Sequence, residues 1–168
     1  MIGMKTNLCS IALLWILIFI SIPVSAQTKK EKREKRKEAV KEIIVSENYK
    51  ITVSTAIPMS GRTVQLTSPY SISVRNDSII SYLPYYGRAY SIPYGGGDGL
   101  IFKAPILTYS MKTTKKGNAD IKFTARSPED KFDFKVTVSE SGYANIQVTM
   151  QNRQSITFYG TLDMKDKE

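Results

Sequence analysis

Hydrophobic and polar residues alternate along most of the chain from residue 49 onward. Because successive side chains of a strand point to opposite faces, this pattern is typical of strands with one buried and one solvated face. The intervening residues are mostly lysine, aspartate, asparagine, glutamine and threonine, which indicates that the second face meets water. The alternating apolar runs are Tyr49-Ile51-Val53, Ile72-Val74, Leu107-Tyr109-Met111, Ile121-Phe123-Ala125, Phe132-Phe134-Val136-Val138, Ala144-Ile146-Val148-Met150 and Ile156-Phe158.

Short turn sequences separate these runs, so consecutive strands are expected to pair. Asn76-Asp77 suits a two-residue hairpin, and Gly117, Pro128 and Gly142 lie in three further turns. No run alternates with a long helix, so a parallel sheet is not expected. We predict an all-β fold with one N-terminal helix: an antiparallel meander of about eight strands that forms a lipocalin-like barrel or a two-layer sandwich.

A charged segment with helical spacing precedes the strands. Residues 29–42 carry eight basic and four acidic side chains. We expect residues 27–46 to form a solvated helix whose last turns pack on an end or an open edge of a single β domain, residues 47–168. A second interpretation is an arm that sits on an anionic membrane surface, although the interleaved glutamates weaken this. The apolar residues expected on one helix face are Ala39, Val40, Ile43 and Ile44.

The first 26 residues are typical of a secretory signal. Lys5 supplies the positive start, Ile11 to Ile20 form the apolar run, and Val24-Ser25-Ala26 is a small-residue cleavage site. The run is about ten residues long, roughly half of what a membrane-spanning helix needs. We predict cleavage after Ala26 and export to the periplasm or the cell surface. Lipid anchoring is not expected, because Cys9 precedes the apolar run.

Removal of this segment limits the chemistry that remains. Cys9 and Trp15 are the one cysteine and the one tryptophan, and the sequence contains no histidine. A disulfide, a hydrolytic triad, a thiol nucleophile and the usual zinc ligands are therefore excluded, and we predict a non-enzymatic protein without a cofactor or metal. Glycosidase-like carboxylate chemistry stays open as a third possibility. The acids considered for it, expected instead to be solubilising charges, are Glu129, Asp130, Asp133 and Glu140.

The positive charge of the chain is concentrated near its start. Removal of Lys5, the one charge in the signal segment, lowers the formal net charge from +9 to +8. Residues 29–42 contribute +4 of this, so the β domain keeps only about +4. This field is too mild to indicate nucleic-acid binding.

Residues 80–99, ISYLPYYGRAYSIPYGGGDG, break the alternation and hold five of the ten tyrosines. Tyrosine offers a large contact area at low entropic cost, which suits the binding of sugars, peptides or a protein partner. The other interpretation is an ordered loop that roofs the open end of the sheet, with the hydroxyls bonded to main chain. We expect Tyr82 and Tyr90 to be structural. The tyrosines expected to be partly exposed near Arg88 are Tyr85, Tyr86 and Tyr94.

The glycines of this stretch do not indicate a nucleotide or calcium site. Gly95 to Gly99 lack the Lys-Ser/Thr pair that follows a phosphate-binding loop, and no helix is expected after them. Asp98 stands alone, whereas calcium needs several oxygen ligands.

Three blocks of the sequence resemble a known family. They are PMSGRTVQLTS (58–68), SYLPYYGRAYSIPYGGGDG (81–99) and GYANIQVTMQNRQSITFYG (142–160), and they are similar to the signature blocks of bacterial domain-of-unknown-function family 4251. The resemblance covers residues 40–162. It implies a small exported protein of a Gram-negative bacterium and carries no activity, ligand or catalytic residue. Tyr86 stands where phenylalanine is expected in the family. The positions that the resemblance marks for testing are Gly61, Arg62, Tyr82, Pro84, Tyr85, Gly87, Arg88, Tyr90, Tyr94, Asn152, Arg153 and Gln154.

These observations lead to one predicted role and two alternatives. We predict an exported, non-enzymatic envelope protein that acts by binding or as a structural component, with an envelope protein or a glycan as partner. The alternatives are a barrel that binds a sugar or small ligand through the loop 82–94, and a glycosidase-like enzyme. Asn152 and Arg153 are expected in the last hairpin turn. If Arg62, Arg88 and Arg153 converged at one end of the barrel, they would create an anion-binding site. The candidate binding residues are Tyr85, Tyr86, Arg88, Tyr90, Tyr94, Arg62 and Arg153.

Overall fold

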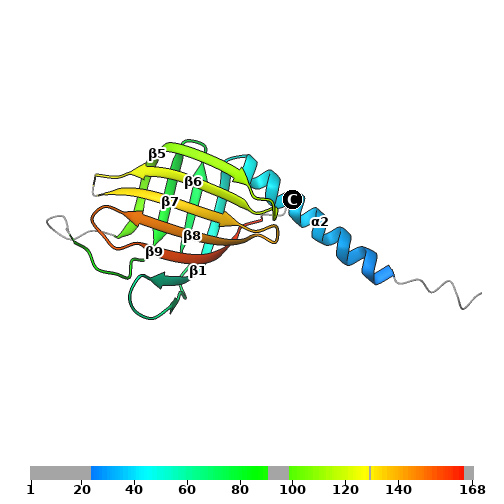
Figure 1. Cartoon of the computed structure of the whole chain (residues 1–168), viewed down its shortest axis with the longest axis horizontal. Coiled ribbons are helices and arrows are strands. Elements are labelled where there is room, and N and C mark those ends of the chain that lie inside the picture. Colours follow the sequence, from blue (N-terminus) through cyan, green and yellow to red (C-terminus); the bar gives the residue numbers. More distant parts are fainter. Residues whose placement is uncertain (1–23, 91–98, 129, 165–168) are drawn as a thin grey trace, which may run out of the picture. The chain divides into compact units, whose positions relative to one another are not determined.

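The computed structural model describes residues 24–90, 99–128 and 130–164. In this part of the chain, one helix precedes nine strands (Figure 1). The elements are α2 (Val24–Val45), β1 (Asn48–Pro58), β2 (Val64–Gln65), β3 (Ser71–Arg75), β4 (Ser78–Leu83), β5 (Leu100–Thr113), β6 (Ala119–Arg126), β7 (Lys131–Val138), β8 (Tyr143–Met150) and β9 (Ile156–Leu162).

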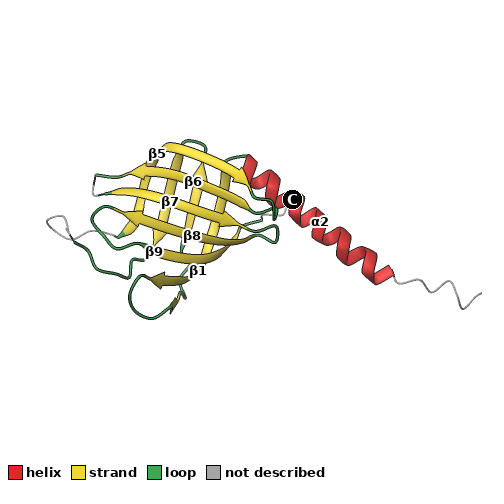
Figure 2. Ribbon diagram, in the orientation of Figure 1, coloured by secondary structure: helices red, strands yellow, loops and turns green. Residues whose placement is uncertain are grey.

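Eight of the strands form a closed antiparallel barrel (Figure 2). Each strand pairs with the next along the chain from β3 to β9, while β1 pairs with β3 on one edge and with β9 on the other. The closing ladder runs from Ile51 opposite Leu162 to Pro58 opposite Ile156. The ninth strand, β2, extends the sheet beside Thr55 and Ala56 of β1. The predicted all-β meander is confirmed, and of its two forms the barrel is the one observed.

Side chains fill the interior of the barrel. The inward residues of β1, β3, β4, β6 and β8 include Ile51, Ile72, Ile79, Ile121 and Ile146, each 0% exposed. Aromatic rings of β5, β6 and β7 stack among them, with centroids 4.2 Å apart for Phe102 and Phe132 and 4.7 Å apart for Phe123 and Phe134. An eight-stranded barrel is just wide enough for its side chains to fill it. The interior is therefore a packed hydrophobic core.

Two details of the strands differ from the sequence expectation. Leu107 was expected to share a buried face with Tyr109, but it is 57% exposed, because a bulge between Ile106 and Thr108 adds one residue to β5 and shifts the alternation. Tyr82 was assigned to a loop, but it lies in β4, whose inward positions end at Leu83. Its neighbour Ser81 is also an inward position, and this buried polar residue masks the alternation in the sequence.

The last turns of α2 pack on the barrel as expected. Val40 and Ile44 are 4% and 1% exposed, and Ile43 packs against the same core. The Nζ atom of Lys37 lies 2.7 Å from a carboxylate oxygen of Glu140, in the connection between β7 and β8. The helical residues up to Glu34 belong to a separate compact unit from the residues that follow. Among the described residues, no helix combines the length and the apolar character needed to span a membrane.

Candidate functional site

The connections between strands gather at two opposite ends of the barrel. At the helix end, the last turns of α2 meet the short turns after β3, β5 and β7, together with the residues that follow β9. At the loop end lie the connections that follow β1, β4, β6 and β8. Because alternate connections of an antiparallel meander fall on the same side, segments that are distant in the sequence meet at the loop end.

Gln154 links three of these connections. Its side-chain Oε1 atom accepts from the Arg88 main-chain N–H at 3.3 Å and lies 3.5 Å from the hydroxyl of Ser60. Its own main-chain N–H donates to the Arg88 carbonyl oxygen at 3.0 Å. Ser60, Arg88 and Gln154 come from the three sequence blocks that carry the family resemblance. The tertiary structure therefore brings these blocks together at one end of the barrel.

The side chains of Tyr85 and Arg153 also link the connections that follow β4 and β8. The Tyr85 hydroxyl lies 3.0 Å from the carbonyl oxygens of both Arg88 and Gln154 and can donate to either. The guanidinium carbon of Arg153 lies 5.6 Å from the centroid of the Tyr85 ring, and its Nη1 atom donates to the Gly99 carbonyl oxygen at 2.7 Å. Burial raises the pKa of the Tyr85 hydroxyl, whereas the hydrogen bond to Gln154 and the charge of Arg153 oppose this rise.

Two glycines leave room for the Tyr85 side chain. A Cβ atom on Gly87 would lie 2.6 Å from the Tyr85 hydroxyl oxygen, and one on Gly99 would lie 3.1 Å from the Tyr85 Cβ. Gly99 also has a φ of +70°, a conformation that other residues rarely adopt. Glycine is therefore required at both positions if the Tyr85 side chain is to keep its observed position.

Asp130 anchors the connection between β8 and β9. This side chain was expected to be a solubilising charge, but Asp130 is only 6% exposed. Its two carboxylate oxygens accept from the main-chain N–H groups of Lys131, Gln151 and Asn152 at 2.8, 3.1 and 3.2 Å. A buried carboxylate needs such donors, and two of the three belong to a connection 21 and 22 residues away in the sequence.

The candidate binding residues divide into a buried and an exposed group. Arg153 is 6% exposed, and Tyr85 is partly buried against the core. Tyr86 and Tyr90 are 37% and 70% exposed, and the side chain of Arg88 is exposed as well. The expected division is wrong for Tyr90, and also for Tyr82, which is 46% exposed and stacks on Tyr70.

The three candidate arginines lie at the loop end, but the part of the chain that the structure describes shows no anion site formed by all three. Arg62 is exposed, two residues beyond Ser60. Arg88 and Arg153 lie on neighbouring connections, since Ala89 and Arg153 form an isolated bridge. The guanidinium of Arg153 is held by Gly99 and Tyr85, as described above, which limits its use in an anion site. Asn152 and Arg153 lie between β8 and β9 as expected. Tyr94 and the glycines 95 to 97 lie outside the described residues.

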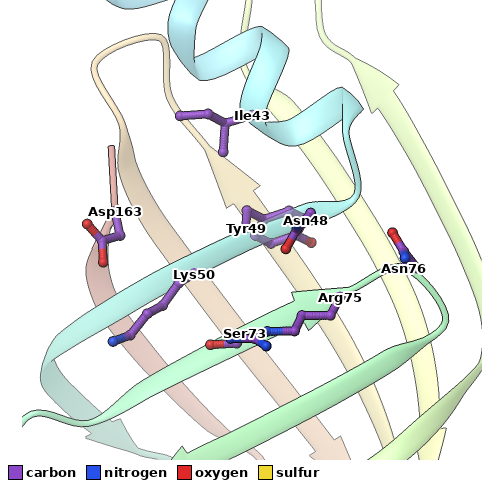
Figure 3. Close-up of a pocket in the computed structure, with 8 residues that line it drawn as sticks. All are labelled: Ile43, Asn48, Tyr49, Lys50, Ser73, Arg75, Asn76 and Asp163. Atoms are coloured by element: carbon purple, nitrogen blue, oxygen red, sulfur yellow. The ribbon is translucent and has the colours of Figure 1, made fainter. Parts of the chain in front are cut away.

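A pocket of about 570 Å³ opens at the helix end, beside β1 and β3 (Figure 3). Its wall contains two cations, one carboxylate, two amides and one hydroxyl. Sequence reasoning missed this site, because its polar side chains look like ordinary solvated positions of alternating strands. No local signal marks it, because Lys50 and Arg75 lie on strands that residues 59–70 separate and that only the β1–β3 ladder brings side by side. The lining residues are Ile43, Asn48, Tyr49, Lys50, Ser73, Arg75, Asn76 and Asp163.

Of the four acidic side chains considered for catalysis, the three in the described residues each have a partner. Asp133 accepts from the Thr124 hydroxyl at 2.7 Å and lies 3.5 Å from Lys131, while Glu140 pairs with Lys37 at the helix end. Asp130 is bound by main chain, and Glu129 lies outside the described residues. Among the described residues, no group of three or more Asp, Glu, Cys or His side chains is placed to hold a metal ion.

Comparison with known proteins identifies a family. Residues 31–162 match the model of a domain of unknown function, DUF4251. The fold is similar to the crystal structure of a DUF4251 family protein from Bacteroides eggerthii DSM 20697, with a TM-score of 0.61 and 16% sequence identity over 76% of this chain and 86% of that chain. No curated protein matches the sequence. The resemblance noted in the sequence is thereby confirmed.

Proposed function

The chain belongs to the DUF4251 family, and we propose that it is an exported, non-enzymatic protein of the cell envelope that binds a protein partner through the loop end of its barrel. One observation carries this proposal. Hydrogen bonds hold residues 85–90, the first part of the connection after β4, in place, yet they leave the side chains of Tyr86, Arg88 and Tyr90 exposed.

Such an arrangement suits recognition. Tyrosine and arginine are enriched at the energetic centres of protein interfaces, because they combine a large contact area with directional hydrogen bonds. Binding costs less conformational entropy when the main chain that carries the side chains is already ordered before the partner binds. Core side chains occupy the interior of the barrel, so a sugar or small ligand, the alternative considered for the loop 82–94, would have to bind outside that interior.

Export is the second part of the proposal and rests on residues 1–26. Mass spectrometry of the protein purified from its host should find a chain that begins at Gln27 and carries no lipid. A mature chain that retains Met1, or a lipid-modified N-terminus, contradicts this part.

The binding site is tested by capture from an envelope extract. The immobilised protein, the triple variant Tyr86→Ala/Arg88→Ala/Tyr90→Ala and the control Tyr143→Ala are compared, with bound proteins identified by mass spectrometry. Tyr143 is a matched control, because it is a 68% exposed tyrosine in β8 outside the loop end. We expect one protein to be captured by the parent and the control but lost in the triple variant.

Two results count against a protein partner at this site. Equal capture by all three forms places the binding surface elsewhere on the molecule. Capture that persists after proteolysis of the extract but disappears after periodate oxidation of its sugars identifies a glycan instead, which is the alternative that exposed tyrosines also suit.

A further inference from the structure

The pocket at the helix end has a cationic floor on the outer surface of two paired strands. Lys50 of β1 lies directly opposite Ser73 of β3, and Asn48 lies opposite Arg75 in the same ladder. Residues two apart on a strand point to the same face, so these four side chains share the outer face of the barrel. In Figure 3 the ends of Lys50, Ser73 and Arg75 lie in one row, with Ser73 in the middle.

Within the part of the chain that the structure describes, neither cation of this floor forms a salt bridge. Among the described residues, neither Lys50 nor Arg75 has a carboxylate oxygen within 4.0 Å, although salt bridges elsewhere in the molecule meet this limit. Asp163 also lines the pocket, and its main-chain N–H donates to the Lys50 carbonyl oxygen at 2.8 Å. In Figure 3 the Asp163 side chain lies on the Lys50 side of the pocket, away from Arg75.

The walls give this floor the shape of a binding site. Ile43 in the last turn of α2 supplies an apolar wall, and Asn48 and Asn76 add amide groups that can donate or accept. The volume of about 570 Å³ lies in the range of sites that hold small organic ligands.

We propose that this pocket binds a small ligand carrying a phosphate monoester group, with Lys50, Ser73 and Arg75 holding the phosphate. Arginine offers a planar fork of donors, lysine a mobile positive charge and serine a hydroxyl, so together they can satisfy the three terminal oxygens of a phosphate. The space beyond the floor accommodates the organic part, where Asp163 and the two asparagines can accept or donate to hydroxyl groups.

Isothermal titration of the exported protein with matched probes tests this inference. The probes are inorganic phosphate, glucose 6-phosphate, glucuronate and glucose, each in the same buffer without phosphate. We expect glucose 6-phosphate to bind more tightly than inorganic phosphate and glucuronate, and glucose not to bind. Glucuronate tests whether a sugar with a carboxylate binds as well as one with a phosphate, and glucose tests whether the sugar binds without an anionic group.

Charge-removing variants connect the binding to the pocket. Lys50→Gln and Arg75→Gln should each lower the affinity for glucose 6-phosphate at least about tenfold, the effect of losing one charge-assisted hydrogen bond. Lys116→Gln, which removes an exposed cation from the turn after β5, should leave the affinity unchanged. Lys50 and Arg75 are themselves exposed, so unchanged thermal unfolding of all three variants is expected to show that the fold is intact.

The location is checked independently by the shifts of main-chain amide NMR signals on titration, expected at residues 48–50 and 73–76. The inference is overturned if neither phosphate probe binds at up to about 10 mM, or if the three variants bind equally well. It is also overturned if glucuronate binds as tightly as glucose 6-phosphate, which would indicate a general anion surface. These results leave partner binding untouched, because that site lies at the opposite end of the barrel.

Discussion

The hydroxyl of Tyr85 lies 3.0 Å from the carbonyl oxygen of Gln154, and this contact joins connections that are 69 positions apart in the sequence. It distinguishes Tyr85 from Tyr86 and Tyr90, the other described tyrosines of the connection after β4. Tyr85 turns inward to the main chain of the connection after β8, whereas Tyr86 and Tyr90 have exposed side chains.

Substitution of these tyrosines should separate the two roles. We expect Tyr85→Phe to lower the free energy of unfolding by about 1 kcal/mol, since one hydrogen bond is lost. Tyr85→Ala should cost about 2 kcal/mol, because packing against the core is lost as well. Tyr90→Ala should change it by less than about 0.5 kcal/mol. Urea unfolding measures all three, and a cost for Tyr90→Ala equal to that for Tyr85→Ala contradicts the assignment.

Closure of the barrel depends on a glycine in β9. A Cβ atom on Gly160 would lie 2.2 Å from the Thr52 carbonyl oxygen and 3.0 Å from the Val53 Cα, so β1 itself would have to move. We expect Gly160→Ala to lower the free energy of unfolding by about 3 kcal/mol. Thr161→Ala, on the exposed face of the same strand, is the control and should cost less than about 1 kcal/mol. A Gly160→Ala protein as stable as the parent shows that the β1–β9 ladder is looser than observed.

Two buried hydroxyls lower the stability of the core. The hydroxyl oxygens of Tyr49 and Tyr109 are buried close to each other, and among the described residues neither forms a hydrogen bond of good geometry. Since burial of an unpaired hydroxyl is unfavourable, Tyr49→Phe should raise the free energy of unfolding at pH 7 by about 1 kcal/mol. Tyr85→Phe removes a hydroxyl that is bonded, so it should have the opposite sign. Destabilisation by Tyr49→Phe in a urea titration indicates that its hydroxyl is bonded in solution.

The same tyrosines predict a loss of stability at alkaline pH. Burial raises the pKa of Tyr49 and of Tyr109 above the ordinary value of about 10. Above about pH 10 the unfolded chain releases these protons while the folded chain retains them, so the free energy of unfolding falls as pH rises. Tyr49→Phe should reduce this fall. Unfolding followed from pH 8 to pH 11 checks the effect, and identical pH profiles for parent and variant contradict it.

The charged part of α2 should contribute little to folding. Lys37 and Glu140 form an ion pair whose side chains are 45% and 23% exposed, and such surface pairs add less than about 1 kcal/mol. Deletion of residues 27–37 should therefore move the midpoint of thermal unfolding by only about 2 to 6 °C. Ile44→Ala, which empties a fully buried position in the last turn, should cost about 3 kcal/mol. If the deletion lowers the free energy of unfolding by more than Ile44→Ala does, the charged segment packs on the protein.

The sequence alone determined most of the strands, their turns and the docked end of the helix, but not β2 or the extent of β4. Alternation of Phe132 and Phe134 with Asp133 and Lys135 specifies which face is buried, because burial of apolar side chains and solvation of charges are local preferences. The apolar residues Val40 and Ile44 likewise marked the helical turns that pack. Where the alternation fails, at the bulge beside Leu107, the reason is an extra residue that only the pairing with β6 reveals.

The tertiary structure decided the closure of the sheet and the contents of both candidate sites. Pairing of β1 with β9 brings together strands from the two ends of the domain, and residues 80–99 alone do not show that Tyr85 finds its hydrogen-bond partner at Gln154. Asp130 and Arg153 have the composition of surface residues and are buried, because main-chain groups from distant connections satisfy their charges. Hydrophobic patterning acts between near neighbours in the sequence, whereas these partners meet only when the barrel closes.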